Sequence, residues 1–365
     1  MEHDPLKIAG GLLALPTAPF HEERVLAHIE CLLTAHRIPF ARDPHGNLIA
    51  RYDRGDGPLW ALVAHTDHPG IEVTSVRGDT VHGTFLGGVR PDRLEGARVR
   101  LHAPPDKPDH GPAGAHITRI RMVRGEKRVT LRLDPDHTAA VGGFGDFDLG
   151  TPRINSRRIA AVAIDDLIGC ATTLAVLVRL KRERRRARVW GVFTRAEEVG
   201  FAGTQKLVAE RGLPGDALVV SLESSMELPG ARPGQGPVIR VGDRATSFDS
   251  DLDRRLHRTA RQIARSDNGF KFQRQLMSGG TCEASVFAAA GYRTTGLAYP
   301  LLNYHNMPTD TARGGIAAEE IATSDFLGGI RLLFEAVRHP EAPEAENARY
   351  LERLARSTGK YIRRL

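Results

Sequence analysis

The sequence predicts an α/β protein with a mostly parallel sheet flanked by helices and a small β-barrel inserted into it. After about residue 155, buried strand-like runs alternate with helical patterns, as in sheets whose strands are joined by crossover helices. Between residues 73 and 153, short β-branched segments separated by Gly, Pro and Asp show no helical period, which is typical of a small barrel or sandwich. The 365 residues suffice for about two domains.

The segment before the insertion is expected to form two helices, a hairpin and one buried strand. In residues 22–38, apolar side chains recur at helical spacing, including Val25, Leu26 and Ile29. The "DPHGN" segment at 43–47 indicates a turn between two short strands. The apolar run within residues 58–67 has the length and continuity of a strand buried on both faces.

After the insertion, strands and helices are expected to alternate as far as about residue 340. The predicted strands cover 157–164, 187–194, 217–223 and 292–300, and the predicted helices cover 167–183, 203–212, 282–291 and 317–339. We therefore expect three parts, which are a discontinuous α/β domain over 1–72 and 154–340, an inserted β domain over 73–153, and a basic helical tail over 341–365.

Composition argues against a nucleic-acid-binding, membrane-spanning or disulfide-rich protein. The net charge is +7, but the basic runs at 179–190 and 350–365 lack the interleaved aromatic residues of nucleic-acid modules and indicate solvated helix ends. No apolar stretch is long enough to span a bilayer, and acidic residues near the start argue against a signal peptide. Three widely spaced cysteines without a CxxC pair indicate reduced thiols and a cytoplasmic location.

Acidic or histidine side chains follow five of the predicted strands, at the point where each strand ends. In chain order they are His65 with Asp67, Asp165 with Asp166, Glu197 with Glu198, Glu223, and His305. In open α/β sheets, ligands bind beyond the carboxyl ends of the strands. We therefore expect these side chains to meet at one edge of the sheet.

Several carboxylates with two histidines and no cysteine form a ligand set that suits zinc, cobalt or manganese. Two ions about 3.5–4 Å apart would need a bridging carboxylate, and a spare carboxylate would accept a proton from the attacking water. Each motif alone has a plainer explanation. Asp165 and Asp166 could start a helix and complement its dipole, Glu223 could form a surface ion pair, and His305 could lie in a loop. Their joint order favours the metal site.

The order of these motifs is H-x-D at 65–67, D-D-x-x-G at 165–169, E-E-x-G at 197–200, a strand-ending acid at 223 and Tyr-His at 304–305. It resembles the cocatalytic zinc exopeptidase clan and, within it, the tetrahedral-type (TET) aminopeptidases, which include glutamyl and deblocking aminopeptidases. The resemblance runs from about residue 5 to 340. It includes "DPHGNLIA", the β insertion, "GDFDLG" before the acid pair, and "SGGTCEASVFAAAGYRTTGLAYP" before the last histidine.

The resemblance implies two divalent metal ions per subunit, with zinc as the first expectation and cobalt or manganese as alternatives. Asp165 would bridge the two ions. His65 and Glu223 would complete one ion, and Glu198 and His305 would complete the other.

Three further residues have roles implied by the resemblance. Glu197 would be the general base that takes a proton from the metal-activated water. Asp67 would orient the His65 imidazole. Asp166 would not bind metal, and in this clan the peptide that joins the two acids is commonly cis.

The activity implied by the resemblance is removal of N-terminal residues from peptides with a free amino terminus. The resemblance also implies a homo-oligomer built from dimers, often a hollow dodecamer, with no nucleic-acid or membrane partner. Two alternatives stay open. One is an amidohydrolase or deacetylase of the same clan acting on small N-acyl substrates, which a Glu at 223 favours and the all-β insertion disfavours. The other is an inactive metal-binding oligomeric scaffold, against which the retained Glu197 and Glu198 argue.

Three positions depart from the family pattern. His68 stands where these aminopeptidases usually have Glu, and it could perturb the site or be an ordinary loop histidine. Glu223 stands where the TET branch usually has Asp, which preserves a ligand with a longer reach. Cys282 followed by Glu283 replaces part of a G-G-T-D-A segment and leaves the substrate pocket undefined, although a nucleophilic role for Cys282 is not expected.

Overall fold

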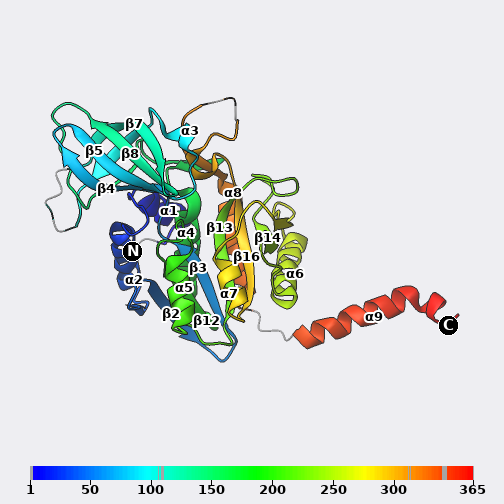
Figure 1. Cartoon of the computed structure of the whole chain (residues 1–365). Coiled ribbons are helices and arrows are strands. Elements are labelled where there is room, and N and C mark those ends of the chain that lie inside the picture. The colour runs from blue at the N-terminus through cyan, green and yellow to red at the C-terminus, as the bar shows by residue number, and fades with distance from the viewer. Residues whose placement is uncertain are drawn as a thin grey trace.

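The computed structural model of the chain describes residues 3–105, 107, 111–310, 312, 314–338 and 343–364. Within these residues, an eight-stranded sheet carries helices on both faces, and a closed six-stranded barrel lies at one end of it (Figure 1). This arrangement confirms the predicted fold class. None of the helices in the described ranges combines the length and the apolar character that crossing a membrane would require.

The strands of the large sheet follow a mixed order with a parallel centre. From edge to edge they are β1 (Phe40–Arg42), β2 (Leu48–Arg54), β12 (Ala187–Thr194), β3 (Leu59–His65), β13 (Leu218–Met226), β16 (Arg293–Leu301), β14 (Val238–Asp243) and β15 (Gln273–Met277). The four central strands β12, β3, β13 and β16 are mutually parallel. Their carboxyl ends therefore lie at the same edge of the sheet.

The side chains of β3 show why its sequence is a continuous apolar run. Trp60, Leu62 and Ala64 join the core cluster on one face, whereas Ala61 and Val63 join the cluster on the other. Helices α1 (Pro5–Leu13), α2 (Glu23–Ala35), α4 (Ile164–Glu183), α6 (Ser250–Ser266) and α8 (Thr323–Ala336) contribute to the first cluster, and α5 (Ala202–Ala209) and α7 (Glu283–Ala289) contribute to or flank the second. A strand covered on both faces needs no polar alternation.

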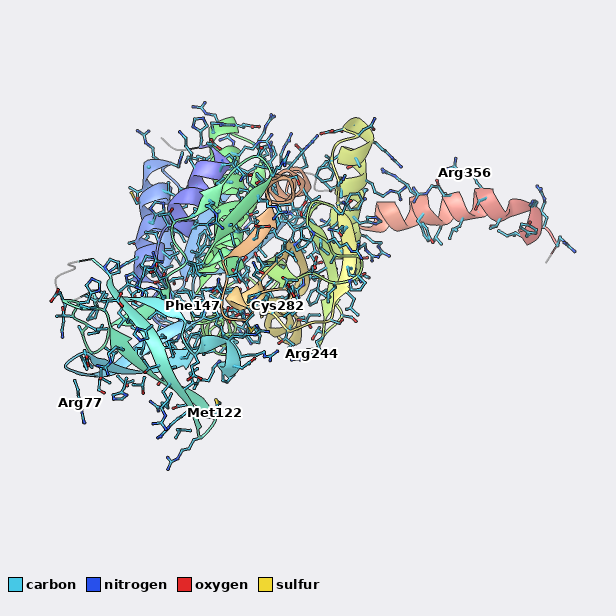
Figure 2. The ribbon with its side chains drawn as sticks, turned by 90° about the horizontal axis from the view of Figure 1, so that it is seen from above. Arg77, Met122, Phe147, Arg244, Cys282 and Arg356 are labelled. Atoms are coloured by element: carbon cyan, nitrogen blue, oxygen red, sulfur yellow. The ribbon has the colours of Figure 1, made fainter. Side chains whose placement is uncertain are left out.

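The inserted segment forms a closed antiparallel barrel. Its strands follow one another as β4 (Gly70–Arg77), β5 (Thr80–Leu86), β8 (Glu126–Leu133), β7 (Ala113–Val123), β6 (Arg98–His102) and β9 (Phe144–Phe147), and the short helix α3 (Pro91–Leu94) joins β5 to β6. The alternating β-branched residues fill its interior. Met122 marks the outer tip of the β7–β8 hairpin, away from the large sheet (Figure 2).

Two expectations about strand placement are wrong. The segment before the acid pair forms β11 (Arg158–Ala161), which belongs to a separate three-stranded antiparallel sheet with β10 (Arg153–Ile154) and β17 (Glu319–Ala322). Asp165 therefore does not follow a strand of the large sheet. The helix predicted over 317–339 begins only at Thr323, because residues 319–322 pair with β11.

The chain ends in helix α9 (Pro343–Ile362), which extends away from the body and carries Arg356 (Figures 1 and 2). Its outward apolar residues include Tyr350, Leu351 and Tyr361, each more than half exposed. This helix lies far from the edge where the central strands end (Figure 1).

Candidate metal centre and active site

The residues predicted for the site converge from five segments of the chain. His65 ends β3, Asp165 lies in the first turn of α4, and Glu198 follows β12. Glu223 lies within β13 rather than after it, and His305 lies in the one-turn helix η1 (Tyr304–Asn306). The carboxyl ends of β12 and β3 are adjacent in parallel register, with Thr194 opposite His65. This register brings the segments of His65 and Glu198 together.

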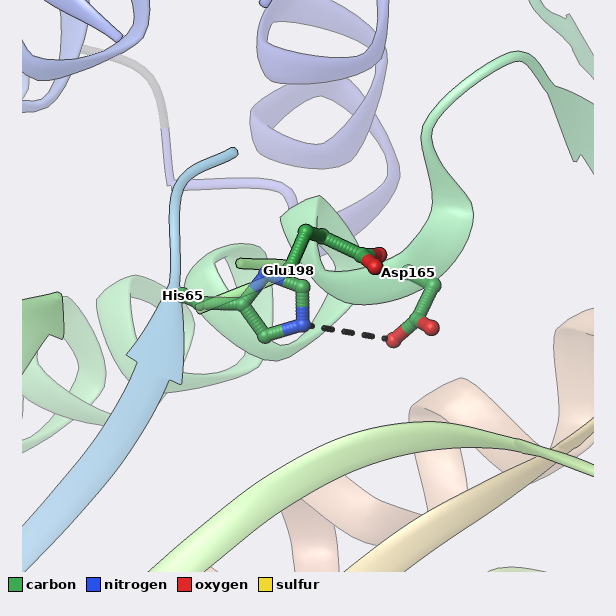
Figure 3. A group of neighbouring side chains, drawn as sticks. All are labelled: His65, Asp165 and Glu198. Atoms are coloured by element: carbon green, nitrogen blue, oxygen red, sulfur yellow. Dashed lines mark ion pairs between the residues drawn. The ribbon is translucent and has the colours of Figure 1, made fainter. Parts of the chain in front are cut away.

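The Asp165 carboxylate lies between the two histidines. Its Oδ1 is 3.5 Å from Nε2 of His65, and its Oδ2 is 3.6 Å from Nε2 of His305. Figure 3 shows the contact with His65 and places Glu198 beside it. Donor atoms about 3.5 Å apart can share one ion at the usual metal–ligand distances of about 2.0–2.2 Å. Each oxygen of Asp165 thus faces a different candidate ion position.

Two groups of side chains could each hold an ion. One consists of His65, Asp165 and Glu198, and the other of His65, Glu197 and Glu223, with ligand atoms within 4.8 Å of one another in each group. His305 joins the first group, because its Nε2 is 3.0 Å from Oε1 of Glu198. Within the described chain, the buried Oε1 atom of Glu223 lacks a hydrogen-bond partner. Unpaired buried carboxylate oxygens are costly unless cations compensate them, so the donor set fits divalent metal ions.

The electrostatics of this cluster are those of crowded carboxylates around two imidazoles. Burial by itself lowers the pKa of His65, but Glu197, Asp165 and Asp67 outweigh it and raise that pKa well above its usual range. His305 behaves alike, with its pKa raised by Glu198 and Asp165 against the effect of burial.

The carboxylates divide into two classes by their surroundings. Burial raises the pKa of Glu223 to about 8, and Asp165 adds to the effect. The pKa of Glu197 is raised well above its usual range by loss of solvent and then by Glu223 and Glu198. Asp165 has a lowered pKa, because hydrogen-bonding contacts with His305 and His65 outweigh its burial. Asp165 is therefore the carboxylate most strongly held in its charged form.

Asp67 anchors the backbone of the loop that carries Glu197 and Glu198. The amide N–H groups of Glu197 and Glu198 donate to its two carboxylate oxygens at 2.9 and 3.0 Å. The Nδ1 atom of His65 is 3.1 Å from the Asp67 backbone oxygen and 3.6 Å from its carboxylate. Asp67 thus touches both His65, a candidate ligand, and the loop with the general-base candidate.

Asp166 is turned away from the candidate ions. The peptide bond between Asp165 and Asp166 is cis, and the Asp166 Oδ1 accepts the Gly169 amide at 3.2 Å. A Cβ at Gly169 would lie 2.1 Å from Asp166 Oδ2, so a side chain at this position of the D-D-x-x-G motif would displace the Asp166 carboxylate. The motif spacing therefore reflects packing of the second acid against the helix.

His68 is buried between two of the ligand segments. Its Nδ1 is 2.7 Å from the Asp165 carbonyl oxygen, and its Nε2 is 2.9 Å from Oδ1 of Asn306. The Asn306 amide nitrogen donates to the Val162 and Ala317 carbonyls, which leaves Oδ1 as the acceptor. Both contacts favour a protonated imidazole, whereas burial lowers the pKa of His68.

Glu319 is a site residue that the sequence did not reveal. It is fully buried, and its two carboxylate oxygens accept the backbone amides of Asp165 at 3.0 Å and of His305 at 2.8 Å. In the sequence it lies in "AAEEIATSD", which has the composition of an ordinary helix start. No local signal distinguishes it from its neighbour Glu320.

Comparisons with known proteins agree with this site and fold. Residues 46–317 match the model of the M42 glutamyl aminopeptidase family. In solved structures, similar chains are a TET aminopeptidase from the marine sediment archaeon Thaumarchaeota archaeon SCGC AB-539-E09 (TM-score 0.77, 20% identity, 94% of this chain and 98% of that one) and the Pyrococcus horikoshii TET1 peptidase (TM-score 0.73, 19% identity, 93% of this chain and 100% of that one). These likenesses show the fold.

A curated relative, YhfE of Bacillus subtilis, is 26% identical over 223 residues, which is 54% of this chain and 63% of that protein. The match thus spans less than two thirds of the relative's length. The family model, in contrast, covers most of the present chain, from the "DPHGN" turn to the residues just before Glu319. The chain belongs to the M42 glutamyl aminopeptidase family.

Proposed function

We propose that this protein is a dinuclear metal-dependent aminopeptidase in which Asp165 bridges the two ions. The observation that carries the proposal is the placement of the two Asp165 oxygens against different histidines, at 3.5 and 3.6 Å. His65 and Glu223 would hold one ion, and Glu198 and His305 would hold the other. When bound, such ions lower the pKa of water and stabilise negative charge on a substrate oxygen.

Glu197 is the general base of the proposed reaction. Its carboxyl takes the proton from the attacking water and then returns it to the leaving amine of the cleaved peptide bond. Two features support this role. The Glu197 carboxyl lies within 4.8 Å of the ligand atoms of His65 and Glu223, and its backbone amide donates to Asp67 Oδ1 at 2.9 Å.

Replacing Glu197 by Gln tests the assignment. Turnover of aminoacyl anilides should fall by about 10²–10⁴-fold, the usual contribution of a general base, while the bound metal is retained. The protein would be loaded with zinc, cobalt or manganese, and its metal content measured by elemental analysis. Unchanged turnover in the Glu197→Gln variant would refute the role of this residue as the base.

A substrate panel separates the aminopeptidase from its alternatives. The wild-type protein is expected to cleave free-amine anilides and short peptides but not N-acetyl amino acids. Cleavage of N-acetyl amino acids alone would instead support an amidohydrolase of the same clan. Bound metal without turnover of any substrate would support a scaffold.

Arg240 gives the proposed enzyme a preference for an acidic N-terminal residue. Its side chain is only 2% exposed and lines a pocket together with Glu223, Met277, Cys282 and Tyr304. Its Nε and Nη1 have no hydrogen-bond partner among the described residues. A buried guanidinium with unused donors is costly, and a carboxylate would satisfy its planar fork. The family description, which names glutamyl substrates, points in the same direction.

The preference is tested by replacing Arg240 with Met, with Lys as the matched variant that keeps the charge. In Arg240→Met, kcat/KM for a glutamyl anilide should fall by about 100-fold or more relative to a leucyl anilide, because a site built to pair a polar group discriminates strongly. Arg240→Lys should lose less. Equal losses for both substrates would refute the preference.

The assembly and setting of the enzyme are also proposals. A similar solved structure is described as a dodecamer and another as a tetrahedron or octahedral shell. We therefore infer a homo-oligomer, and light scattering of the full chain would measure its size. The cytoplasmic location and the domain boundaries at 73–153 and 341–365 stay predictions from the sequence.

A further inference from the structure

We propose that His68, Asn306 and Glu319 form a positioning ring that fixes the His305 ligand relative to the Asp165 bridge. The inference rests on the metal centre proposed above. It concerns three side chains that bind no metal themselves but connect the segments that carry the ligands.

The ring closes through both sides of the Asp165 backbone. The Asp165 amide donates to Glu319 Oε2 at 3.0 Å, and its carbonyl accepts from His68 Nδ1 at 2.7 Å. The other Glu319 oxygen accepts the His305 amide at 2.8 Å. The other nitrogen of His68 reaches Oδ1 of Asn306, the residue after His305, at 2.9 Å. Two independent paths thus connect Asp165 to the His305 segment.

The His305 segment needs such support because its backbone is unfavourable by itself. Asn303, His305 and Asn306 have φ values of +57°, +53° and +60°, in the left-handed region. For His305 this conformation costs about 1–2 kcal/mol, whereas asparagine adopts it at lower cost. The segment holds it because Asn306 donates to the carbonyls of Val162 and Ala317, and because Glu319 holds the His305 amide. Glu319 and Asn306 are themselves fully buried, so water cannot readily replace their bonds.

The two candidate ions should depend on the ring to different degrees. The ion at His65 and Glu223 would be held by residues within or at the end of regular strands. The ion at Glu198 and His305 depends on a ligand whose backbone the ring holds directly. We therefore expect loss of the ring to weaken the second ion more than the first, by about 10–100-fold, the range seen when partners of metal ligands are removed.

His68→Ala and Asn306→Ala, alone and together, test the ring in the full-length protein. Cobalt is titrated into the metal-free protein, and both dissociation constants are obtained from its visible absorption and from calorimetry. Each single variant should weaken one cobalt ion by about 10-fold or more and leave the other within about 3-fold. The double variant should bind cobalt no more weakly than the single variant with the larger loss, because the effects of substitutions within one network are not additive.

Matched variants keep the result interpretable. His102→Ala removes another buried histidine, which hydrogen-bonds Asp146 in the barrel at 2.8 Å, and should leave both cobalt ions unchanged. Should His68→Ala fail to fold, Glu319→Gln keeps the size of the side chain, removes one acceptor and should weaken the same ion. Wild-type affinity for both ions in His68→Ala would overturn the ring. Equal losses of affinity at both ions, adding up in the double variant, would overturn it as well. The ring is tested by metal affinity and not by activity. A wild-type protein that binds two ions without cleaving peptides would therefore refute the proposed aminopeptidase activity but not the ring.

Discussion

The two halves of the proposed metal centre are built in different ways. The strand half comprises His65 and Glu223, which belong to the adjacent parallel strands β3 and β13. The loop half comprises Glu198 and His305, which lie in a turn after β12 and in the one-turn helix η1. Asp165 belongs to both halves, because its two oxygens face one histidine of each.

The difference teaches how the fold positions a ligand where no regular element does so. In the strand half, the backbone hydrogen bonds of the sheet determine where the side chains begin. In the loop half, buried carboxylates do this work, since Asp67 accepts the amide of Glu198 and Glu319 accepts the amide of His305. The position of a ligand in the loop half therefore depends on the buried carboxylate that accepts its backbone amide.

The largest expected effect comes from the residue that the halves share. Asp165→Asn keeps the shape of the side chain but removes its charge and one of its two acceptor oxygens. Since loss of a ligand exceeds loss of a ligand's partner, both ions should be weakened by more than about 100-fold. Calorimetric titration with zinc measures this effect. Retention of either ion at wild-type affinity would mean that Asp165 serves only one half.

The next largest effect is a difference between the two halves in how metal affinity depends on pH. Metal ligands must be deprotonated, and the metal-free protein has raised pKa values at His65, at His305 and, to about 8, at Glu223. A group with a raised pKa holds its proton to higher pH, and that proton must leave when the ion binds. Affinity should therefore rise with pH in both halves, and more steeply in the strand half, which loses protons from both His65 and Glu223.

This prediction is checked by measuring both dissociation constants from pH 6 to 9 and by calorimetry in buffers of different ionisation enthalpy. Glu223→Gln serves as the control, because it removes one of the two titrating groups of the strand half. The pH slope of that half should then approach the slope of the loop half. Identical slopes in the wild-type protein would contradict the difference.

A smaller effect is expected from crowding the loop half alone. A Cβ at Gly88 would lie 2.7 Å from Nδ1 of His305, so Gly88→Ala should displace the His305 imidazole from its position beside Glu198 and Asp165. We expect the ion of the loop half to weaken by about 10-fold, while the strand half is preserved. Gly215→Ala is the matched control, because a Cβ there would meet nothing within 4 Å. Equal loss of both ions would indicate that the halves are not independent.

The sequence predicted the strand half better than the loop half. The apolar run of β3 ends at His65, and hydrophobic continuity alone locates that residue at the edge of the sheet. The strand-end pattern indicated His305 as it did His65, but nothing in the local pattern of His305 indicates its left-handed backbone. Glu319 was missed, since its partners Asp165 and His305 are distant in sequence and its own segment has the composition of a helix start.

The same contrast explains the two errors in the fold. The segment of β11 has a strand-like sequence, but its partner β17 lies more than 150 residues later in the chain, so its membership of a small separate sheet has no local signal. Residues 319–322 were assigned to a helix because they directly precede a true helical pattern. In the structure, pairing with β11 outweighs that local preference.

The smallest effect is expected outside both halves, at Cys282. Its Sγ lies 3.6 Å from Asp243 Oδ2, and burial raises the pKa of the thiol well above its usual range. A neutral thiol is a poor nucleophile, so Cys282→Ala should leave kcat within about 2-fold and both ions in place, although Cys282 lines the proposed substrate pocket. Steady-state kinetics with the glutamyl anilide measure turnover, and elemental analysis measures the bound metal. A loss of about 100-fold in kcat with both ions retained would place the chemistry on the thiol, and the division of the site into a strand half and a loop half would no longer account for hydrolysis.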